Sequence, residues 1–472
     1  KALKGNFICV LNDNDMSISP PVGAMASYIT SIRTTRLYDG MKRKFQRIFD
    51  RIPAIGTPLK RRIETTVKRF RSSLLDVPTG VLFEEFGFKY LGPIDGHNLT
   101  AVMAALNYAK HHDGPVMLHL MTKKGKGMDV AEANPIKYHG VSAQPKKPAA
   151  PSSPKRPTYT QCFGDEIIAI AKENPQVHVI TPAMREGSGL VAYEAAFPDR
   201  YYDVGIAEEH AVTFAAGLSR GGVLPVLAIY STFLQRGFDQ MIHDVCLQKL
   251  PMVLAIDRAG LVGADGPTHH GVFDINYLTM IPNMVVCAPK DGDELKALLR
   301  WAVTSQKIVS IRYPRGNVPV ENGTHATPVI YGDCEVMKTP DTPQSDILIL
   351  AVGNFAWRAI NIADQLEAKG TRVTVVNLRF IKPLDTNTLT PLIESSRLVC
   401  VLEDGAQIGG AFHYVLNQMG ELNKPLNEWV SIAIPDHFID HGPVTTLQED
   451  IGMSDTAIVQ RLETQLAGMS VH

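Results

Sequence analysis

Short runs rich in Val, Ile and Leu recur along the chain, and helical or polar segments separate them. Such runs lack the alternation of a half-exposed strand, so we expect strands that are buried on both faces. Buried strands separated by helices predict mostly parallel sheets covered by helices, which is an α/β fold. The clearest runs are VHVIT (177–181), VLPVLAIYS (223–231), MVLAID (252–257) and MVVCAP (284–289).

A linker divides the chain. Residues 142–157 read SAQPKKPAAPSSPKRP, a composition typical of an extended, exposed connector. The 472 residues exceed one ordinary domain. Strand-like and helical segments alternate in the second region and again in the third. In the third, FAWRAINIADQLEAKG predicts a helix that ends at Gly370. We therefore expect a first region at 1–141, a second at 158–322 and a third at 323–472.

Composition excludes several classes of protein. The 47 basic and 48 acidic residues nearly balance, so charge gives no indication of nucleic acid or membrane as a partner. No apolar run approaches the ~20 residues of a membrane span.

The six cysteines form no CxxC pair, which favours buried free thiols in a reducing compartment. The basic stretch 33–71 is interpreted as amphipathic helices with solvent-facing Lys and Arg rather than as an anion site.

Two polar segments that follow strands could carry chemistry. LNDNDMSIS (11–19) offers amide, carboxylate and carbonyl oxygens suited to magnesium, although Asn and Asp are also common in ordinary turns. DVGIAEEHAVTFAAGL (203–218) places Glu208 and Glu209 at the start of a helix. We assign Glu209 to the helix N-terminus, whereas for Glu208 the residues alone leave capping and catalysis both open.

Three further segments complete the set. YSTFLQRGFDQ (230–240) combines aromatic side chains that could stack a heterocycle with an arginine that could hold a phosphate. DRAGLVGADGPTHHG (257–271) is a Gly-rich loop whose histidines could transfer protons near neutral pH. RYPRGN (312–317) places Arg315 in a turn.

Together these segments closely resemble the 1-deoxy-D-xylulose-5-phosphate synthases, a transketolase-like family that uses thiamine diphosphate. The resemblance extends over essentially the whole chain. It includes LFEEFGFKYLGPIDGHN (82–98), MTKKGKG (121–127), TPAMREGSGL (181–190) and VVNLRFIKPLD (375–385).

The resemblance implies a homodimer with three α/β domains, acting in the bacterial cytoplasm, with a plastid as the alternative. The expected reaction condenses pyruvate with D-glyceraldehyde 3-phosphate, with loss of carbon dioxide, to supply isoprenoid precursors and, in bacteria, thiamine and pyridoxal phosphate. The region 1–141 would be the remainder of the diphosphate-binding domain, 158–322 the pyrimidine-binding domain and 323–472 the C-terminal transketolase-like domain.

The resemblance also implies which residues contact the cofactor. Glu208 matches the glutamate that bonds the aminopyrimidine ring and promotes its activation. Phe233 matches the aromatic residue that stacks on that ring, with Tyr230 beside it and toward the substrate. Asn14 and the carbonyl of Met16 match two ligands of Mg²⁺, which anchors the diphosphate.

Further matches concern the substrates. His269 matches a histidine close to the reacting carbons that is suited to proton transfer. Arg258 and Arg315 match the pair that holds the phosphate of D-glyceraldehyde 3-phosphate. Arg236, on the cofactor side, and Asp265, on the substrate side, match further pocket residues.

Two departures from the family pattern stand out. The family's GDG motif, which supplies the acidic magnesium ligand, is expected ~30 residues before Asn14. Because this sequence starts at Lys1 and enters the strand-like run FICVLN at once, we expect that this segment and its histidines are missing and that cofactor binding is weak. The family also has Tyr at the position of Met128, which can fill space but offers no hydroxyl.

Two alternatives remain open. The chain could be the β-type subunit of another thiamine-diphosphate enzyme, such as a split transketolase, although the motifs at 92–98 and 257–271 and the presence of region 1–141 argue against it. It could instead be a non-catalytic, dimer-forming relative, but such a protein has no reason to retain Glu208, His269, Arg258 and Arg315 together.

Overall fold

The computed structural model describes residues 5–14, 16, 83–140, 156–319, 328–342, 344–420, 425 and 428–469. The chain divides into two compact units, Lys1–Lys147 and Pro148–His472, which are treated separately below. The basic stretch 33–71 and nearly all of the linker 142–157 lie outside the described residues. Within the described part, no helix is both long and apolar enough to cross a membrane.

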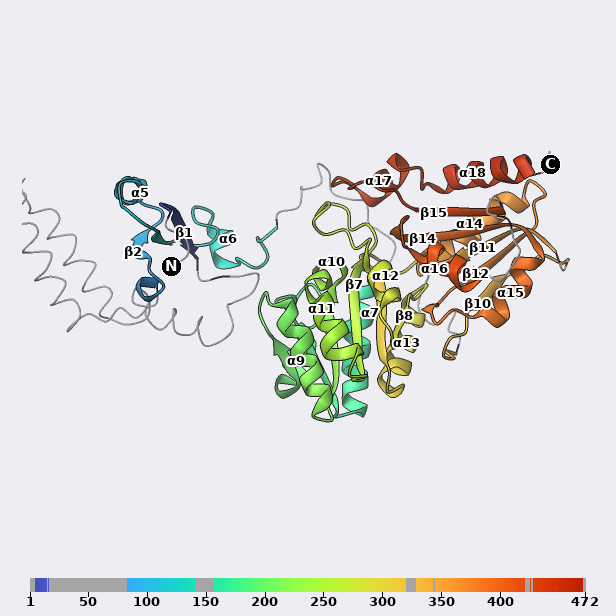
Figure 1. Ribbon diagram of the computed structural model, residues 1–472, viewed down its shortest axis with the longest axis horizontal. Helices are drawn as coiled ribbons and strands as arrows, with labels where there is room; N and C mark the ends of the chain where they lie inside the picture. Colours follow the sequence, from blue (N-terminus) through green and yellow to red (C-terminus); the bar gives the residue numbers. More distant parts are fainter. Residues whose placement is uncertain are drawn as a thin grey trace, which may run out of the picture. The chain divides into compact units, whose positions relative to one another are not determined.

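The first unit contains a parallel sheet in the strand order β1-β3-β2. Its elements are β1 (Ile8–Asp13), β2 (Lys89–Asp95), α5 (Leu99–Lys110), β3 (Val116–Met121) and α6 (Asp129–Ala133) (Figure 1). The central strand β3 is buried over most of its length, whereas the edge strand β1 is largely exposed. The expected strand at FICVLN is therefore present, but Cys9 is exposed and departs from the expectation of buried thiols.

The second unit contains a larger sheet in the order β13-β8-β9-β7-β6-β4-β5. Neighbouring strands are parallel except for the β13–β8 pair. Every residue of β6 is buried, as expected for a strand covered on both faces. The strands are β4 (Val177–Thr181), β5 (Tyr201–Asp203), β6 (Leu224–Tyr230), β7 (Met252–Ala259), β8 (Met284–Cys287), β9 (Ile308–Pro314) and β13 (Phe380–Lys382).

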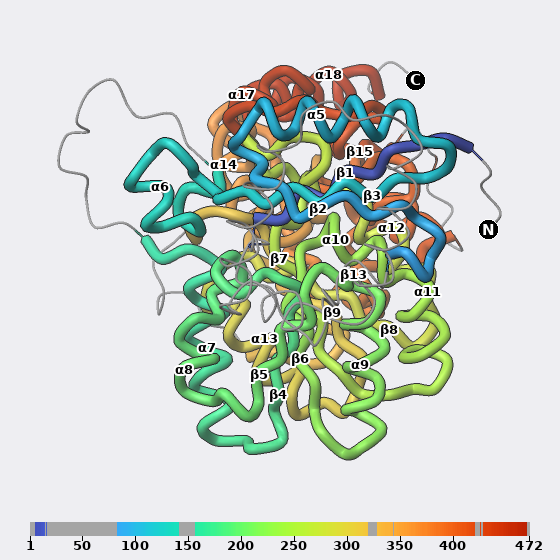
Figure 2. The backbone as a smooth tube through the Cα atoms, turned by 90° about the vertical axis from the view of Figure 1, so that its left-hand side faces the viewer, coloured from blue at the N-terminus to red at the C-terminus, as the bar shows by residue number. Residues whose placement is uncertain are grey.

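Helices cover both faces of this sheet. Figure 2 shows α7 and α8 on one side of β4, β5 and β6 and α9 on the other. Helix α7 begins at a capping box in which Thr158 and Gln161 satisfy each other's backbone amides. The helical segments are α7 (Tyr159–Glu173), α8 (Val191–Ala196), η1 (Pro198–Arg200), α9 (Glu208–Arg220), α10 (Ser231–Leu234), η2 (Gln235–Gly237), α11 (Phe238–Gln240), η3 (Met241–Cys246), α12 (Asp274–Met280) and α13 (Gly292–Thr304).

A second sheet in this unit has the order β10-β12-β11-β14-β15 and is parallel except for β10. Its strands are β10 (Glu335–Lys338), β11 (Ser345–Ala351), β12 (Val373–Asn377), β14 (Ser396–Ala406) and β15 (Trp429–Ile434). The helices are α14 (Phe355–Glu367), α15 (Thr386–Glu394), α16 (Ala411–Gln418), α17 (Val444–Asp450) and α18 (Asp455–Gly468), of which α14 and α18 pack together (Figure 1). Gly370 follows α14 with a φ of 89°, as a helix stop requires.

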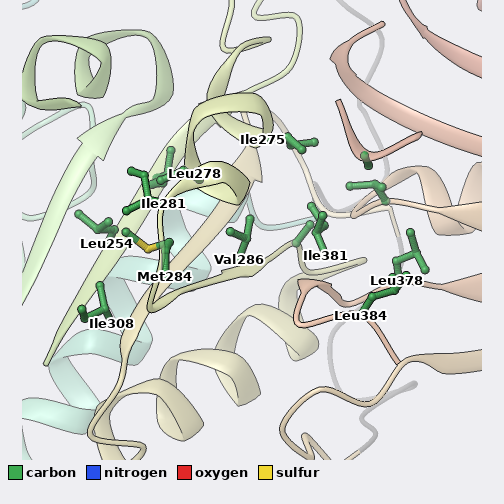
Figure 3. Close-up of a cluster of buried hydrophobic side chains, with 14 of the residues drawn as sticks. Leu254, Ile275, Leu278, Ile281, Met284, Val286, Ile308, Leu378, Ile381 and Leu384 are labelled. Atoms are coloured by element: carbon green, nitrogen blue, oxygen red, sulfur yellow. The ribbon is translucent and has the colours of Figure 1, made fainter. Parts of the chain in front are cut away.

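One hydrophobic core joins the two sheets of the second unit. Leu254 on β7 and Leu278 on α12 belong to the same buried cluster as Leu348 on β11 and Val376 on β12. Figure 3 shows part of this cluster. Strand β13 also crosses over from the later segment to pair with β8. The sheets are therefore packed as one body, although the sequence boundary expected at 322–323 separates their main strands.

Candidate active site

Neighbouring strands of the larger sheet end together and present the expected site residues at one edge. Tyr230, at the end of β6, pairs in register with Asp257 on β7. Ala259, next to Arg258, pairs with Pro314 on β9, next to Arg315. In parallel α/β sheets, this carboxyl edge is where ligands bind. The topology thus gathers residues that are distant in the sequence.

Tyr230 is the centre of an aromatic group. Its ring stacks on that of Phe233, with centroids 5.3 Å apart, and Phe233 makes an edge contact of 5.4 Å with His269. The guanidinium of Arg258 lies over the Tyr230 ring at 4.3 Å. Burial raises the pKa of Tyr230 to about 12, so its hydroxyl keeps its proton at neutral pH. The group offers flat apolar faces, a hydroxyl and an imidazole together.

Glu208 is the first residue of α9, and it is buried to 3% exposure. Both of its carboxylate oxygens accept hydrogen bonds from Nη1 of Arg236, at 3.2 and 3.1 Å. Within the described part of the chain, no amide of its own helix donates to this carboxylate. A hydrogen-bonded cap of α9 therefore does not account for this side chain, although its place in the first turn still complements the charge of the helix N-terminus. Glu209 is exposed and lies in the first turn of α9, as predicted.

The two arginines at the sheet edge already have acidic neighbours. Arg258 adopts a φ of 63° and donates through Nη1 to Asp257 at 2.5 Å and to Thr160 at 3.1 Å. Arg315 donates through Nη1 to Asp265 at 2.6 Å. Among the described residues, the hydrogen bonds of both guanidinium groups use Nη1 alone, so their other N–H groups are available to an anion. This arrangement suits recognition of a phosphate.

Asn14, Met16 and Met128 belong to the first unit. The Asn14 side-chain oxygen accepts a hydrogen bond from the Met16 amide at 3.1 Å, which folds the turn after β1. Asn14 and Met128 both line an open pocket of about 570 Å³. Met128 is half exposed and precedes α6. The pocket therefore contains residues from the two first-unit segments, around Asn14 and Met128, for which the family resemblance implies cofactor contact.

The same pocket contains residues that the sequence reasoning missed. Lys123, Lys124 and Lys126 line it together with His97. Gly125 lies between these lysines with a φ of 79°, and an added Cβ there would lie 2.8 Å from Ala131. The run of lysines and glycines in MTKKGKG was the available signal, because closely spaced Lys and Gly favour binding of anionic groups.

Each unit by itself offers groups that suit one part of a thiamine diphosphate cofactor. The second unit supplies a buried carboxylate and an aromatic stack, and the first supplies a lysine-lined pocket. In the described ranges, no group of three His, Cys, Asp or Glu side chains could hold a metal ion. Any magnesium site in these ranges would therefore depend on amide and carbonyl oxygens such as those of Asn14 and Met16.

Family models match three successive parts of the chain. The model described as 1-deoxy-D-xylulose-5-phosphate synthase matches residues 1–122. The transketolase pyrimidine binding domain matches residues 155–321, and the transketolase C-terminal domain matches residues 339–458.

Individual relatives match over nearly the whole chain. Identity is 44% over 471 residues with the 1-deoxy-D-xylulose-5-phosphate synthase of Aquifex aeolicus, covering 98% of this chain and 72% of the relative. It is 42% over 475 residues with 1-deoxy-D-xylulose-5-phosphate synthase 1 of Geobacter sulfurreducens, with the same two coverages of 98% and 72%. A solved structure described as a split gene transketolase, inactive beta4 tetramer, superposes with a TM-score of 0.59 at 25% identity, covering 66% of this chain and 98% of that one.

Proposed function

Because the chain belongs to the 1-deoxy-D-xylulose-5-phosphate synthase family, we propose roles for its residues in the reaction of that family. The enzyme is a transferase that depends on thiamine diphosphate. It condenses pyruvate with D-glyceraldehyde 3-phosphate, with loss of carbon dioxide, to form 1-deoxy-D-xylulose 5-phosphate for isoprenoid synthesis.

We assign cofactor contact in the second unit to Glu208, Phe233 and Arg236. When bound, thiamine diphosphate supplies the electron sink that makes decarboxylation feasible. The Glu208 carboxylate would bond the aminopyrimidine and hold the proton that this ring exchanges. Its near-complete burial supports this role, because a proton-transfer group works best where water does not compete. Phe233 would stack on the ring, and Arg236, which bonds the Glu208 carboxylate, would line the cofactor side of the pocket.

Arg258 and Arg315 would bind the phosphate of D-glyceraldehyde 3-phosphate. The pairing of β7 with β9 supports this assignment, because it brings both arginines to one edge of the sheet. Asp265 would orient Arg315 through their 2.6 Å ion pair. A bidentate guanidinium contact matches the geometry of a phosphate and adds specificity to charge.

His269 and Tyr230 would serve the reacting carbons. The edge contact of His269 with Phe233 supports this role, because it places an imidazole beside the ring that would stack the cofactor. Near pH 7 an imidazole can take up a proton, and the resulting imidazolium can release it again. Tyr230 would donate a hydrogen bond to a substrate oxygen, since its hydroxyl remains protonated.

In the first unit, Asn14 and the carbonyl of Met16 would be ligands of Mg²⁺. The turn closed by the Asn14–Met16 hydrogen bond supports this, because magnesium prefers such oxygen donors next to a diphosphate. The lysines of the same pocket, with Met128 at its rim, would neutralise the diphosphate. We assign residues 1–141 to diphosphate binding, 158–322 to pyrimidine binding and 323–472 to the C-terminal domain.

The assembly that we propose is a homodimer in the bacterial cytoplasm. Large apolar side chains exposed on the second unit support it: Ile206, Phe273, Ile408 and Phe438. A lone β-type subunit fits less well, because the synthase model matches residues 1–122 in addition to the two transketolase domains.

The observation that supports the function most strongly is identity of 42 to 44% with named synthases over 98% of the chain. The test is to supply the holoenzyme with pyruvate and D-glyceraldehyde 3-phosphate in the presence of thiamine diphosphate and Mg²⁺. We expect carbon dioxide and 1-deoxy-D-xylulose 5-phosphate in equal amounts. Carbon dioxide release without the sugar product would overturn the assignment.

A further inference from the structure

Asp404, on strand β14, lies directly against the turn that follows Arg258. A Cβ added to Gly260 would lie 2.6 Å from Oδ2 of Asp404 and 3.0 Å from its Cβ. Gly260 itself has a φ of 72°, which a glycine adopts without strain. The backbone two residues beyond Arg258 is thus in contact with a carboxylate of the second sheet.

A buried arginine fixes the position of this carboxylate. Arg312 on β9 donates through Nη1 to Oδ1 of Asp404 at 2.6 Å and through Nε to Asp274 at 2.9 Å. Arg312 is only 2% exposed, and Asp274 is fully buried. The two oxygens of Asp404 therefore have separate roles: Oδ1 is held by Arg312, and Oδ2 lies against Gly260. Because Arg312 also bonds Asp274, the three side chains form a buried charge network that holds Asp404 from one side.

Gly260 also closes the loop that carries Asp265 and His269. Its amide donates to the carbonyl of Gly271 at 2.8 Å, and the Gly271 amide donates back to the carbonyl of Gly260 at 2.8 Å. The second sheet holds this loop at another point, where the Ala406 amide donates to the carbonyl of Val272 at 2.8 Å. The base of the loop is consequently anchored on β14.

The backbone conformation of Arg258 depends on its surroundings, which include this anchored turn. Its φ of 63° places a non-glycine residue in the left-handed region. Such a residue persists there only where its surroundings determine the backbone, and such positions concentrate at functional sites. On its far side, an added Cβ at Gly271 would collide with the carbonyl oxygen of Arg258. The turn 258–260 is therefore confined between Gly271 and Asp404.

We propose that Asp404 is a positioning residue for the acceptor phosphate, so that the C-terminal domain sets the enzyme's preference for a phosphorylated aldehyde. Asp404, fixed by Arg312, holds the turn that aims the Arg258 guanidinium. The proposal rests on the role assigned to Arg258 above and names a contribution from a domain that carries none of the residues assigned to the substrates.

The test compares two acceptors in the holoenzyme, D-glyceraldehyde 3-phosphate and unphosphorylated D-glyceraldehyde. The ratio of their kcat/KM values reports phosphate recognition and is insensitive to the fraction of folded enzyme. Asp404→Asn should lower this ratio by about tenfold, the value of one charge-assisted hydrogen bond. KM for D-glyceraldehyde 3-phosphate should rise, while KM for pyruvate should stay within about twofold.

A matched control is Asp346→Asn, which breaks an Arg–Asp pair with Arg372 at 2.9 Å in the same domain. This control should leave the acceptor ratio unchanged. If Asp404→Asn does not fold, Gly260→Ala keeps both charges of the Arg312–Asp404 contact but places a methyl group 2.6 Å from Oδ2 of Asp404, and it should lower the ratio in the same way.

Two results would overturn the proposal, and they are distinguishable. A folded Asp404→Asn or Gly260→Ala enzyme with the wild-type ratio would remove Asp404 from phosphate recognition and leave the site assignment standing. An unchanged ratio in Arg258→Met would remove Arg258 from the phosphate site, and the inference would fall with it.

Discussion

The guanidinium of Arg236 bonds both carboxylate oxygens of Glu208, at 3.2 and 3.1 Å, although the two side chains differ sharply in exposure. Glu208 is 3% exposed, whereas the Arg236 side chain is 56% exposed. A hydrated cation that faces solvent can move away at small cost, while a buried anion cannot. The pair therefore joins a buried carboxylate to a guanidinium that solvent reaches, which is compatible with the cofactor contact proposed for Glu208.

Glu208→Gln in the holoenzyme should lower kcat by ~100 to 10,000-fold, because a positioned proton-transfer group typically contributes that much. KM for pyruvate should change less, and calorimetry should find thiamine diphosphate bound nearly as well. Deuterium exchange at the thiazolium carbon should slow in parallel with turnover. Glu209→Gln, in the same first turn but exposed, is the control and should stay near wild type. Turnover of Glu208→Gln within a few-fold of wild type would remove Glu208 from the mechanism.

Arg315→Met should raise KM for D-glyceraldehyde 3-phosphate about tenfold or more, the effect of losing a charge-assisted bond to phosphate. KM for pyruvate should change little. Arg300→Met is a matched control, because both arginine side chains are 46% exposed and both pair with carboxylates. Steady-state kinetics with each substrate varied in turn decides the matter. Equal effects of the two variants would mean that Arg315 has only a structural role.

Lys124→Gln should weaken thiamine diphosphate binding about tenfold if the lysine-lined pocket of the first unit receives the diphosphate. Binding of thiamine, which has no phosphate, should be unaffected in calorimetry. Lys110→Gln, at the end of α5 and outside the pocket, serves as the control. Loss of affinity for both ligands alike would contradict a diphosphate-specific contact and would indicate a change in the fold of the first unit.

The stability of the second unit should fall as pH rises toward 7, because of Glu403. Burial raises the pKa of this carboxyl from 4.5 to about 7, although the amides of Ala411 and Phe412 donate to it and act in the opposite direction. Between these two pH values the folded state retains a proton that the unfolded chain has lost. The free energy of unfolding should therefore fall by about 3 kcal/mol across this window, at about 1.4 kcal/mol per pH unit.

Glu403→Gln should reduce this slope by the Glu403 share, about 1.4 kcal/mol per pH unit, in urea unfolding measured at several values between pH 5 and 7.5. Asp346→Asn is the control, because Arg372 lowers the pKa of Asp346 to about 2, so its contribution is already complete above pH 5. That variant should keep the wild-type slope. The same slope in wild type and Glu403→Gln would show that Glu403 does not titrate in this range.

Much of the fold was predictable because a buried strand requires a local pattern of apolar residues. A strand covered on both faces needs a continuous apolar run, and β6, β7, β8 and β11 all have one. Family motifs likewise indicated Tyr230, Phe233, Arg258 and His269, which the structure brings together at the edge of the larger sheet. Each of these motifs follows a strand, so their gathering followed from the parallel topology.

Other features were decided only by tertiary packing. The exposure of Cys9 depends on β1 being an edge strand, and the crossing of β13 into the larger sheet depends on how the two sheets dock. The bonds from Arg236 to Glu208, and the contact of Asp404 with Gly260, join segments that are remote in the sequence. A sequence pattern records what a residue needs, such as burial or a counter-charge, but not which distant residue provides it. The sequence thus determined which segments form strands and which functional groups are present, whereas the packing of the sheets determined which of these groups contact each other.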